Sequence, residues 1–303
     1  MKHLPRHIIG GIALTNGVLM HTPDAAVMGI RGTDGHVYTK SWALPERKST
    51  QSWLMWPGIR GLWLLVRTIL WNSRVRAVAD SISKDLQKTS GGKGHDMPGH
   101  APSSLFPSLG ILAAFLLYAT IILSVNAYFD LMNGNFAMAQ STILTVLLTF
   151  VILVVLVRRA GIWTYMAYHG ALHQAINGFE SGSRSHKTTS NQWPWQARCG
   201  VSVVAYVALG LVIIGIFWTD TSFWQSILLA LILFSVSYEI VQWLDRYSDN
   251  WWARGLLAPA VVMQFLVARQ PSKEHSEVAS HVLFELEHFS KDMKQHASEP
   301  LLT

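Results

Sequence analysis

The sequence predicts a mainly α-helical integral membrane protein with four transmembrane helices, a cytoplasmic α+β amino-terminal part and an amphipathic carboxyl-terminal helix. Half of the 303 residues are hydrophobic and 14% are charged, which is few for a soluble chain of this length. Four segments are long and apolar enough to cross a bilayer, which takes about 20 residues. Basic residues also alternate between successive loops, a pattern typical of multi-pass membrane proteins.

The charge and the cysteine content argue against two other classes of protein. The net charge of +6 would suit a nucleic-acid-binding protein, but the basic residues are spread between apolar segments and do not form one patch. The single cysteine, Cys199, excludes an internal disulfide and hence a secreted domain held together by such bonds. We therefore expect membrane lipids as partners and no nucleic acid.

Residues 1–48 predict a small cytoplasmic β unit. The runs IALTNGVLM, AAVMGIR and HVYTKSWAL have the length and the apolar character of short strands. Asp34 and Gly35 predict a tight turn between the second run and the third.

Residues 49–88 predict an amphipathic helix at the membrane interface. Arg60, Arg67 and Arg74 recur every seven residues, so they lie on one helical face. We expect this helix to lie in the membrane plane with the arginines on lipid headgroups. In the alternative, the helix packs on the protein's own core and the arginines form a solvated stripe. A flexible, glycine-rich linker follows over residues 89–104.

The predicted spans form two pairs. The first pair lies within residues 105–158, at about 105–129 and 141–157, and the second pair within residues 201–244, at about 201–218 and 223–244. Lys and Arg are frequent before the first span, between the pairs and after the last span. By the positive-inside rule, both termini and the central helix and loop at 159–200 face the cytoplasm of a bacterial inner membrane.

Two segments follow the last predicted span. Residues 245–272 are apolar but contain Arg254 and Pro259, so we expect a buried or re-entrant interfacial segment and not a fifth span. Residues 273–303 predict an amphipathic helix and tail that docks on the cytoplasmic part. The apolar stripe of this helix consists of Val278, Val282, Leu286, Phe289 and Met293.

Four residues at one predicted membrane depth could bind a divalent metal such as zinc. His169 and His173 are four residues apart, so both lie on one face of a helix. Cys199 directly precedes the third span, and Glu239 lies near the cytoplasmic end of the fourth, where a carboxylate can ligate metal or act as a base. The alternatives are a polar helix face, a small packed cysteine and a glutamate that reaches the headgroups.

Several collinear blocks carry a resemblance to a known family. The blocks are GGIALTNGVLM, PGIRGLWLLVRTI, YHGALHQAINGFESG, ARCGVSV, SYEIVQW and LLAPAVVMQFLVARQPSKEHSEVA. Over about residues 8–288 the chain resembles the YqhQ family of bacterial membrane proteins, a conserved domain of unknown function that is sometimes labelled a predicted metal-dependent enzyme. The resemblance implies a membrane architecture and a metal site at the histidine and cysteine blocks.

The chain departs from the family pattern at positions that an enzyme would use. Ile12 and Asn16 stand where the family has Gln and Glu, and Leu172 replaces the Glu of the histidine block. The remaining departures are His21 for Arg, Gln174 for Lys, Gln196 for His and Ala197 for Pro. The candidate metal ligands His169, His173, Cys199 and Glu239 are retained.

Three functions are compatible with these observations. The leading one is a non-catalytic or weakly metal-binding accessory or assembly component of a membrane complex. The 13 tryptophans and 10 methionines suit lipid-facing belts and contacts with other membrane subunits. The alternative is a membrane-embedded metal-dependent enzyme at the cytoplasmic interface. A transporter or channel is disfavoured because Glu239 is the one charged residue within the predicted spans.

Overall fold

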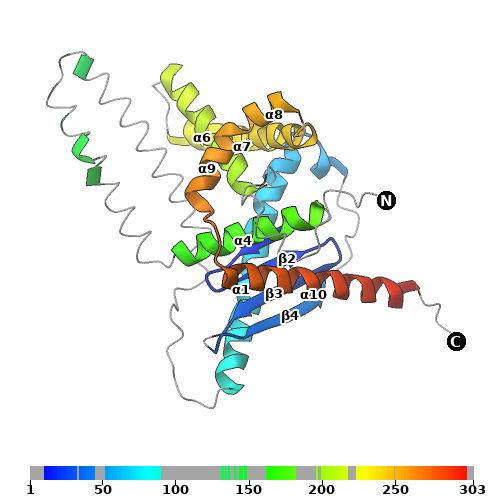
Figure 1. The fold of residues 1–303 in the computed structure, drawn as a ribbon. Helices are drawn as coiled ribbons and strands as arrows, with labels where there is room; N and C mark the ends of the chain where they lie inside the picture. Colours follow the sequence, from blue (N-terminus) through cyan, green and yellow to red (C-terminus); the bar gives the residue numbers. More distant parts are fainter. Residues whose placement is uncertain are drawn as a thin grey trace.

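The computed structural model describes residues 10–32, 34–44, 52–89, 162–181, 196, 199–217, 223–248 and 250–298, and parts of 131–148. Within these residues, an antiparallel sheet lies between helices on both of its faces. A second group of helices lies beyond one end of the sheet, at the top of the view (Figure 1).

The sheet is a meander of four strands in the order β1-β2-β3-β4. The strands are β1 (Gly10–Ala13), β2 (Gly17–His21), β3 (Ala25–Arg31) and β4 (Val37–Ala43). The first strand-like run of the sequence is thus two strands, because the chain turns back where the Leu14 N–H donates to the Gly17 carbonyl at 2.9 Å. Gly35, with φ of 82°, occupies the turn before β4.

Both faces of the sheet are buried because alternate residues of β2 and β3 enter two different cores. On one face, Val18 and Val27 pack against α4 (Ile162–Glu180) and α10 (Lys273–Ser298). On the other face, Leu19 and Met28 pack against α1 (Ile59–Thr89), which contributes Val75 and Ile82. Period-two alternation therefore places apolar residues on each side of the sheet.

The helix at each predicted amphipathic segment packs on this sheet. Of the predicted apolar stripe of α10, Val278, Val282 and Leu286 are buried in the core, and Phe289 and Met293 are partly buried and pack against it. The carboxyl-terminal half of α1 covers the opposite face, which is the arrangement in which a helix packs on the protein's own core. The amino-terminal half of α1 packs against α7, so α1 connects the sheet to the second group of helices.

The second group consists of a short 3-10 helix, η1 (Ser52–Met55), and the helices α6 (Gly200–Phe217), α7 (Phe223–Arg246), α8 (Trp251–Leu256) and α9 (Ala258–Val267). α6 packs against both α7 and α9. α8 and α9 are separated at Leu257, and Pro259 lies in the first turn of α9, where its missing N–H costs no helical hydrogen bond.

The prediction of a four-span integral membrane protein is wrong. The described residues form eight helices and a four-stranded sheet, and among these helices α7 alone has a segment long and apolar enough to cross a membrane, Ile227–Arg246. The apolar stretch of α6, Gly200–Leu211, is shorter than a span requires. Predicted span 105–129 lies outside the described residues, and so does most of 141–157.

The physical reason for this error is that apolar runs also serve burial within a protein. α6 packs against α7 and α9, and Val203 and Ala205 of α6 are buried. Hydropathy does not distinguish a lipid neighbour from a protein neighbour. The multi-pass topology and the orientation that follows from it are therefore not supported.

Candidate metal centre

Two histidines of α4 point toward the segment that enters α6. α4 presents one face to the sheet, where Leu172 and Ile176 join the core. His169 and His173 lie one helical turn apart and are 8% and 3% exposed. Their rings are perpendicular, with centroids 4.5 Å apart. The i, i+4 spacing therefore produces a buried pair of imidazoles and not a solvated polar face.

Gly170, between the histidines, lets α4 approach another segment of backbone. A Cβ atom at this position would lie 1.9 Å from the carbonyl oxygen of Arg269, a separation that no side chain tolerates. The Arg269 N–H donates to the Met166 carbonyl at 3.0 Å. The YHGA motif thus carries a packing requirement together with its histidines.

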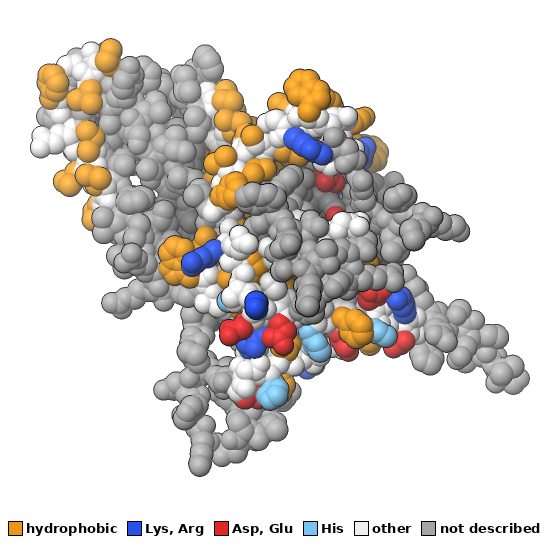
Figure 2. All heavy atoms as spheres, in the orientation of Figure 1, with side chains coloured by type: hydrophobic (Ala, Val, Ile, Leu, Met, Phe, Trp, Pro, Cys, Tyr) orange, Lys and Arg blue, Asp and Glu red, His pale blue; other side chains and the backbone are white. Residues whose placement is uncertain are grey.

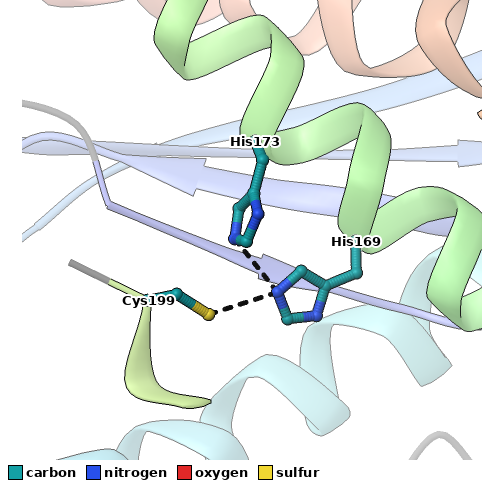
Figure 3. Close-up of side chains that lie close together, drawn as sticks. All are labelled: His169, His173 and Cys199. Carbon is teal, nitrogen blue, oxygen red and sulfur yellow. Dashed lines mark hydrogen bonds between the residues drawn. The ribbon is translucent and has the colours of Figure 1, made fainter. Parts of the chain in front are cut away.

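Cys199 lies at the start of α6, directly before Gly200. The Cys199 N–H donates to the Gln196 carbonyl at 3.2 Å, and the Cys199 carbonyl accepts from the Ser202 N–H at 2.9 Å. Cys199 is 9% exposed, and its thiol points from the end of this turn toward α4 (Figure 3).

The three side chains converge on one point. The Nε2 atoms of His169 and His173 are 3.0 Å apart, and the Cys199 Sγ is 3.4 Å from the His169 Nε2 (Figure 3). One ligand atom from each residue lies within 4.8 Å of the others. Around a tetrahedral zinc ion, bond lengths of about 2.0–2.3 Å place two nitrogens about 3.3 Å apart and a nitrogen and a sulfur about 3.6 Å apart. The observed separations approach those of a ligand set.

Burial keeps His169 and Cys199 uncharged at neutral pH. Desolvation, followed by the neighbouring His173, holds the pKa of His169 well below its ordinary value of 6.5. Desolvation also raises the pKa of the Cys199 thiol to about 11. Both groups are therefore neutral, and the imidazole needs no deprotonation before it ligates a metal. A cation would ionise the thiol.

Tyr165 and the outer nitrogen of His169 complete the surroundings. Tyr165 lies one turn before His169, with its ring edge-on to the imidazole at 5.9 Å, and burial raises the pKa of its hydroxyl to about 12. The buried Nδ1 of His169 has no hydrogen-bond partner in the described part of the chain. Metal-bound histidines usually donate this N–H to an acceptor, and the described residues supply none here.

Glu239 does not belong to this cluster. The Arg60 Nε donates to Glu239 Oε1 at 2.7 Å, and the Arg60 Nη2 donates to Oε2. The Gly58 N–H donates to the same Oε1 at 3.1 Å. This two-point ion pair joins the start of α1 to α7 and occupies the carboxylate that the sequence offered as a ligand or base.

The other two arginines of the predicted headgroup stripe differ in position. Arg67 is half-buried on α1, and the side chain of Arg74 lies outside the described part of the chain. Arg60 is in the pair with Glu239. The headgroup role of the three residues stays a prediction.

Sequence reasoning missed Gln264, which is 1% exposed in α9. Its amide contacts the backbone of Gln196 and the hydroxyl of Ser202. The available signal was a single polar residue within the apolar run AVVMQFLVA, because a lone amide in a buried helix requires partners.

Comparison with known proteins yields one match. Neither the curated proteins nor the solved structures include a match to this chain. A family model described as a protein of unknown function, DUF1385, matches residues 56–288. This range covers most of the chain and includes both histidines and Cys199. The chain therefore belongs to the DUF1385 family of proteins of unknown function.

Proposed function

We propose that the protein binds one divalent transition-metal ion through His169, His173 and Cys199, and that the ion ties α4 to the start of α6. The observation that carries the proposal is the pair of separations around the His169 Nε2, 3.0 Å to His173 and 3.4 Å to Cys199. These atoms come from segments 30 residues apart in the sequence.

Zinc is the metal that this donor set favours. Two imidazoles and a thiolate suit zinc, whereas magnesium and calcium prefer oxygen ligands. Copper also accepts two histidines and a cysteine, so metal analysis must measure both ions. Three protein ligands leave a fourth tetrahedral position for water or another ligand.

A non-catalytic role fits the surroundings of the centre best. In the described residues, no carboxylate joins the three ligand atoms, so a bound water would lack the general base of metal hydrolases. Leu172, in the place of the family's glutamate, belongs to the buried core. The fourth tetrahedral position, which these three ligands leave open, is the one observation that favours the alternative, a metal-dependent enzyme at a membrane surface.

We place the protein at the bacterial cytoplasmic membrane, with α7 as the helix that contacts lipid. The 20 residues of Ile227–Arg246 extend about 30 Å as a helix, close to the thickness of the hydrocarbon core. Hydrophobic side chains gather over α6–α9, whereas charged ones gather over α10 (Figure 2). Trp243, Tyr247 and Trp252 form one aromatic group near the end of α7, which suits the headgroup region.

This location accords with the resemblance to the YqhQ family and with an accessory role in a membrane assembly. Membrane attachment through α7 is tested by fractionating cells that express the full chain. Retention in the membrane pellet after a high-pH carbonate wash supports it, and release into the supernatant contradicts it.

Metal binding is tested by elemental analysis of the purified full chain for zinc and copper. Cys199→Ser removes the thiolate and His275→Gln serves as the control, since His275 lies on α10 and contacts Tyr168 rather than the metal ligands. Metal in the wild type and the control, with loss in the Cys199 variant, supports the proposal. Equal metal content in all three proteins contradicts it.

A further inference from the structure

The ligand segment around Cys199 is held by a single buried side chain of another helix. The Oε1 of Gln264 accepts from the Gln196 N–H at 2.8 Å, and its Nε2 donates to the Gln196 carbonyl, also at 2.8 Å. The same Nε2 donates to the Ser202 Oγ at 2.9 Å. Because Gln264 both accepts from and donates to the backbone of Gln196, as a neighbouring strand would, it fixes the position and the direction of that backbone.

These contacts fall on both sides of the cysteine. Gln196 lies three residues before Cys199 and its carbonyl also accepts from the Cys199 N–H. Ser202 lies three residues after Cys199, and its N–H donates to the Cys199 carbonyl. Gln264 therefore fixes the turn that carries the thiol without contacting the sulfur.

The chain directly after Gln264 also contacts α4, the helix that carries the histidines. Five residues beyond Gln264, the backbone of Arg269 contacts α4 at Met166 and at Gly170. The Arg269 guanidinium lies over the Trp163 ring at 5.4 Å from its centroid. Residues 264–269, which we name the bracket, thus connect the cysteine turn at one end to α4 at the other.

We infer that Gln264 is a positioning residue for the proposed metal site, which it serves by holding Cys199 over the histidine pair. The inference rests on the proposed function. A site with three protein ligands binds a metal ion tightly only when the ligand side chains are already in place, because ordering a mobile side chain consumes part of the binding free energy. Loss of an outer-shell partner typically weakens metal affinity by roughly 10–100-fold.

The first arm of the test measures cobalt binding, since cobalt(II) replaces zinc and gives a thiolate charge-transfer band. Gln264→Met keeps the volume of the side chain and removes its hydrogen bonds. We expect affinity for cobalt to fall by roughly 10–100-fold and the thiolate band to weaken toward that of Cys199→Ser. Gln242→Met is the matched control, since Gln242 donates to the Tyr238 hydroxyl away from the centre.

The second arm needs no metal. Cys199 is the single cysteine of the chain and is buried, so its alkylation by a maleimide in chelator reports directly on how firmly the turn is held. We expect alkylation to be at least about tenfold faster in Gln264→Met than in the wild type or Gln242→Met, because local opening limits access to a buried group.

The two arms separate the inference from the proposed function. If the wild type binds no cobalt but Gln264→Met is alkylated faster, the metal proposal fails and the role of Gln264 in holding Cys199 stands. If a folded Gln264→Met protein retains both wild-type affinity and wild-type alkylation, the inference is overturned. Should that variant fail to fold, Ser202→Ala removes one of the three contacts of Gln264. We then expect a smaller loss of cobalt affinity and a smaller increase in the alkylation rate. Wild-type affinity and wild-type alkylation in Ser202→Ala would overturn the inference.

Discussion

The sulfur of Cys199 lies 3.4 Å from the Nε2 of His169, although 30 residues separate the two in the sequence. The contact joins the start of α6 to the middle of α4, and both side chains are buried. A buried thiol beside the neutral imidazole of His169 gains one weak hydrogen bond at most. A bound cation would convert the same geometry into a three-point link between the two segments.

Metal binding is expected to release one proton for each ion bound. Burial raises the pKa of the Cys199 thiol to about 11, so the thiol is protonated at neutral pH and must lose its proton to ligate. His169 loses none, because desolvation keeps its pKa low. Calorimetric titration of zinc in buffers of different ionisation enthalpy measures the released protons. A release of about one proton that is absent in Cys199→Ser agrees with this mechanism, and the same release in both proteins does not.

Substitution of Glu239 is expected to destabilise the protein and leave its metal content unchanged. Glu239→Gln removes the charge opposite Arg60, whose side chain is 29% exposed, and a half-buried cation without its partner costs roughly 1–3 kcal/mol. Thermal unfolding in detergent and elemental analysis measure the two effects.

The control for Glu239 is Glu287→Gln, which removes the surface pair with Lys291. Such i, i+4 pairs contribute about 0.3–0.5 kcal/mol, so a smaller shift is expected. A Glu239→Gln protein that keeps its stability but loses its metal would return Glu239 to the ligand set.

Gly170→Ala is expected to disrupt the contact between α4 and the bracket. The added Cβ would lie 1.9 Å from the Arg269 carbonyl oxygen, and forcing a methyl group into packed structure costs about 1–3 kcal/mol or more. Gly255→Ala in α8 is the control, because a Cβ added there would meet no atom of the described residues within 4 Å, and alanine favours a helix. Equal unfolding temperatures for the two variants would show that the approach at Gly170 is not required.

Some of these contacts could be predicted from the sequence because they depend on local spacing. Strand-like runs and an Asp-Gly pair mark the β unit, and a helical period marks both the stripe of α10 and the histidine pair. Each of these signals is contained within about one element. The contacts that such a residue makes still depend on distant segments. The seven-residue spacing places the arginines on one face of α1, but Arg60 forms an ion pair with Glu239 of α7.

The remaining relationships join distant segments and leave no local signal. Arg60 and Glu239 are 179 residues apart, and Gln264 contacts a residue 68 positions earlier. No period in the chain connects such residues. The common depth assigned to Glu239 rested on four spans, and among the described residues only α7 is long and apolar enough to cross a membrane. The apolar composition gave the wrong fold class for a related reason, since hydropathy records the preference for burial and not the partner.

The metal-free protein is expected to lose stability as the pH falls below about 6.5. Burial, followed by His173, holds the pKa of His169 well below 6.5, and burial also lowers the pKa of His275. The unfolded chain therefore binds more protons than the folded one in this range, and stability is present above the ordinary histidine pKa and is lost on acidification. Around His275, Glu274 opposes the shift and Arg31 adds to it.

Unfolding of the chelated protein between pH 8 and pH 5 measures this dependence, and His275→Gln is expected to reduce the slope. An unfolding temperature that is constant or rises toward pH 5 would contradict the neutral state of the buried imidazoles.

The central claim, that His169, His173 and Cys199 form one metal site, is tested most directly by the metal content of the full chain. The protein is purified without chelator, equilibrated with a low concentration of zinc and analysed beside the triple variant His169→Gln, His173→Gln, Cys199→Ser. We predict about one zinc ion per wild-type chain and less than about a tenth of that in the triple variant, with His275→Gln equal to the wild type. Wild-type protein that holds no more metal than the triple variant would contradict the claim.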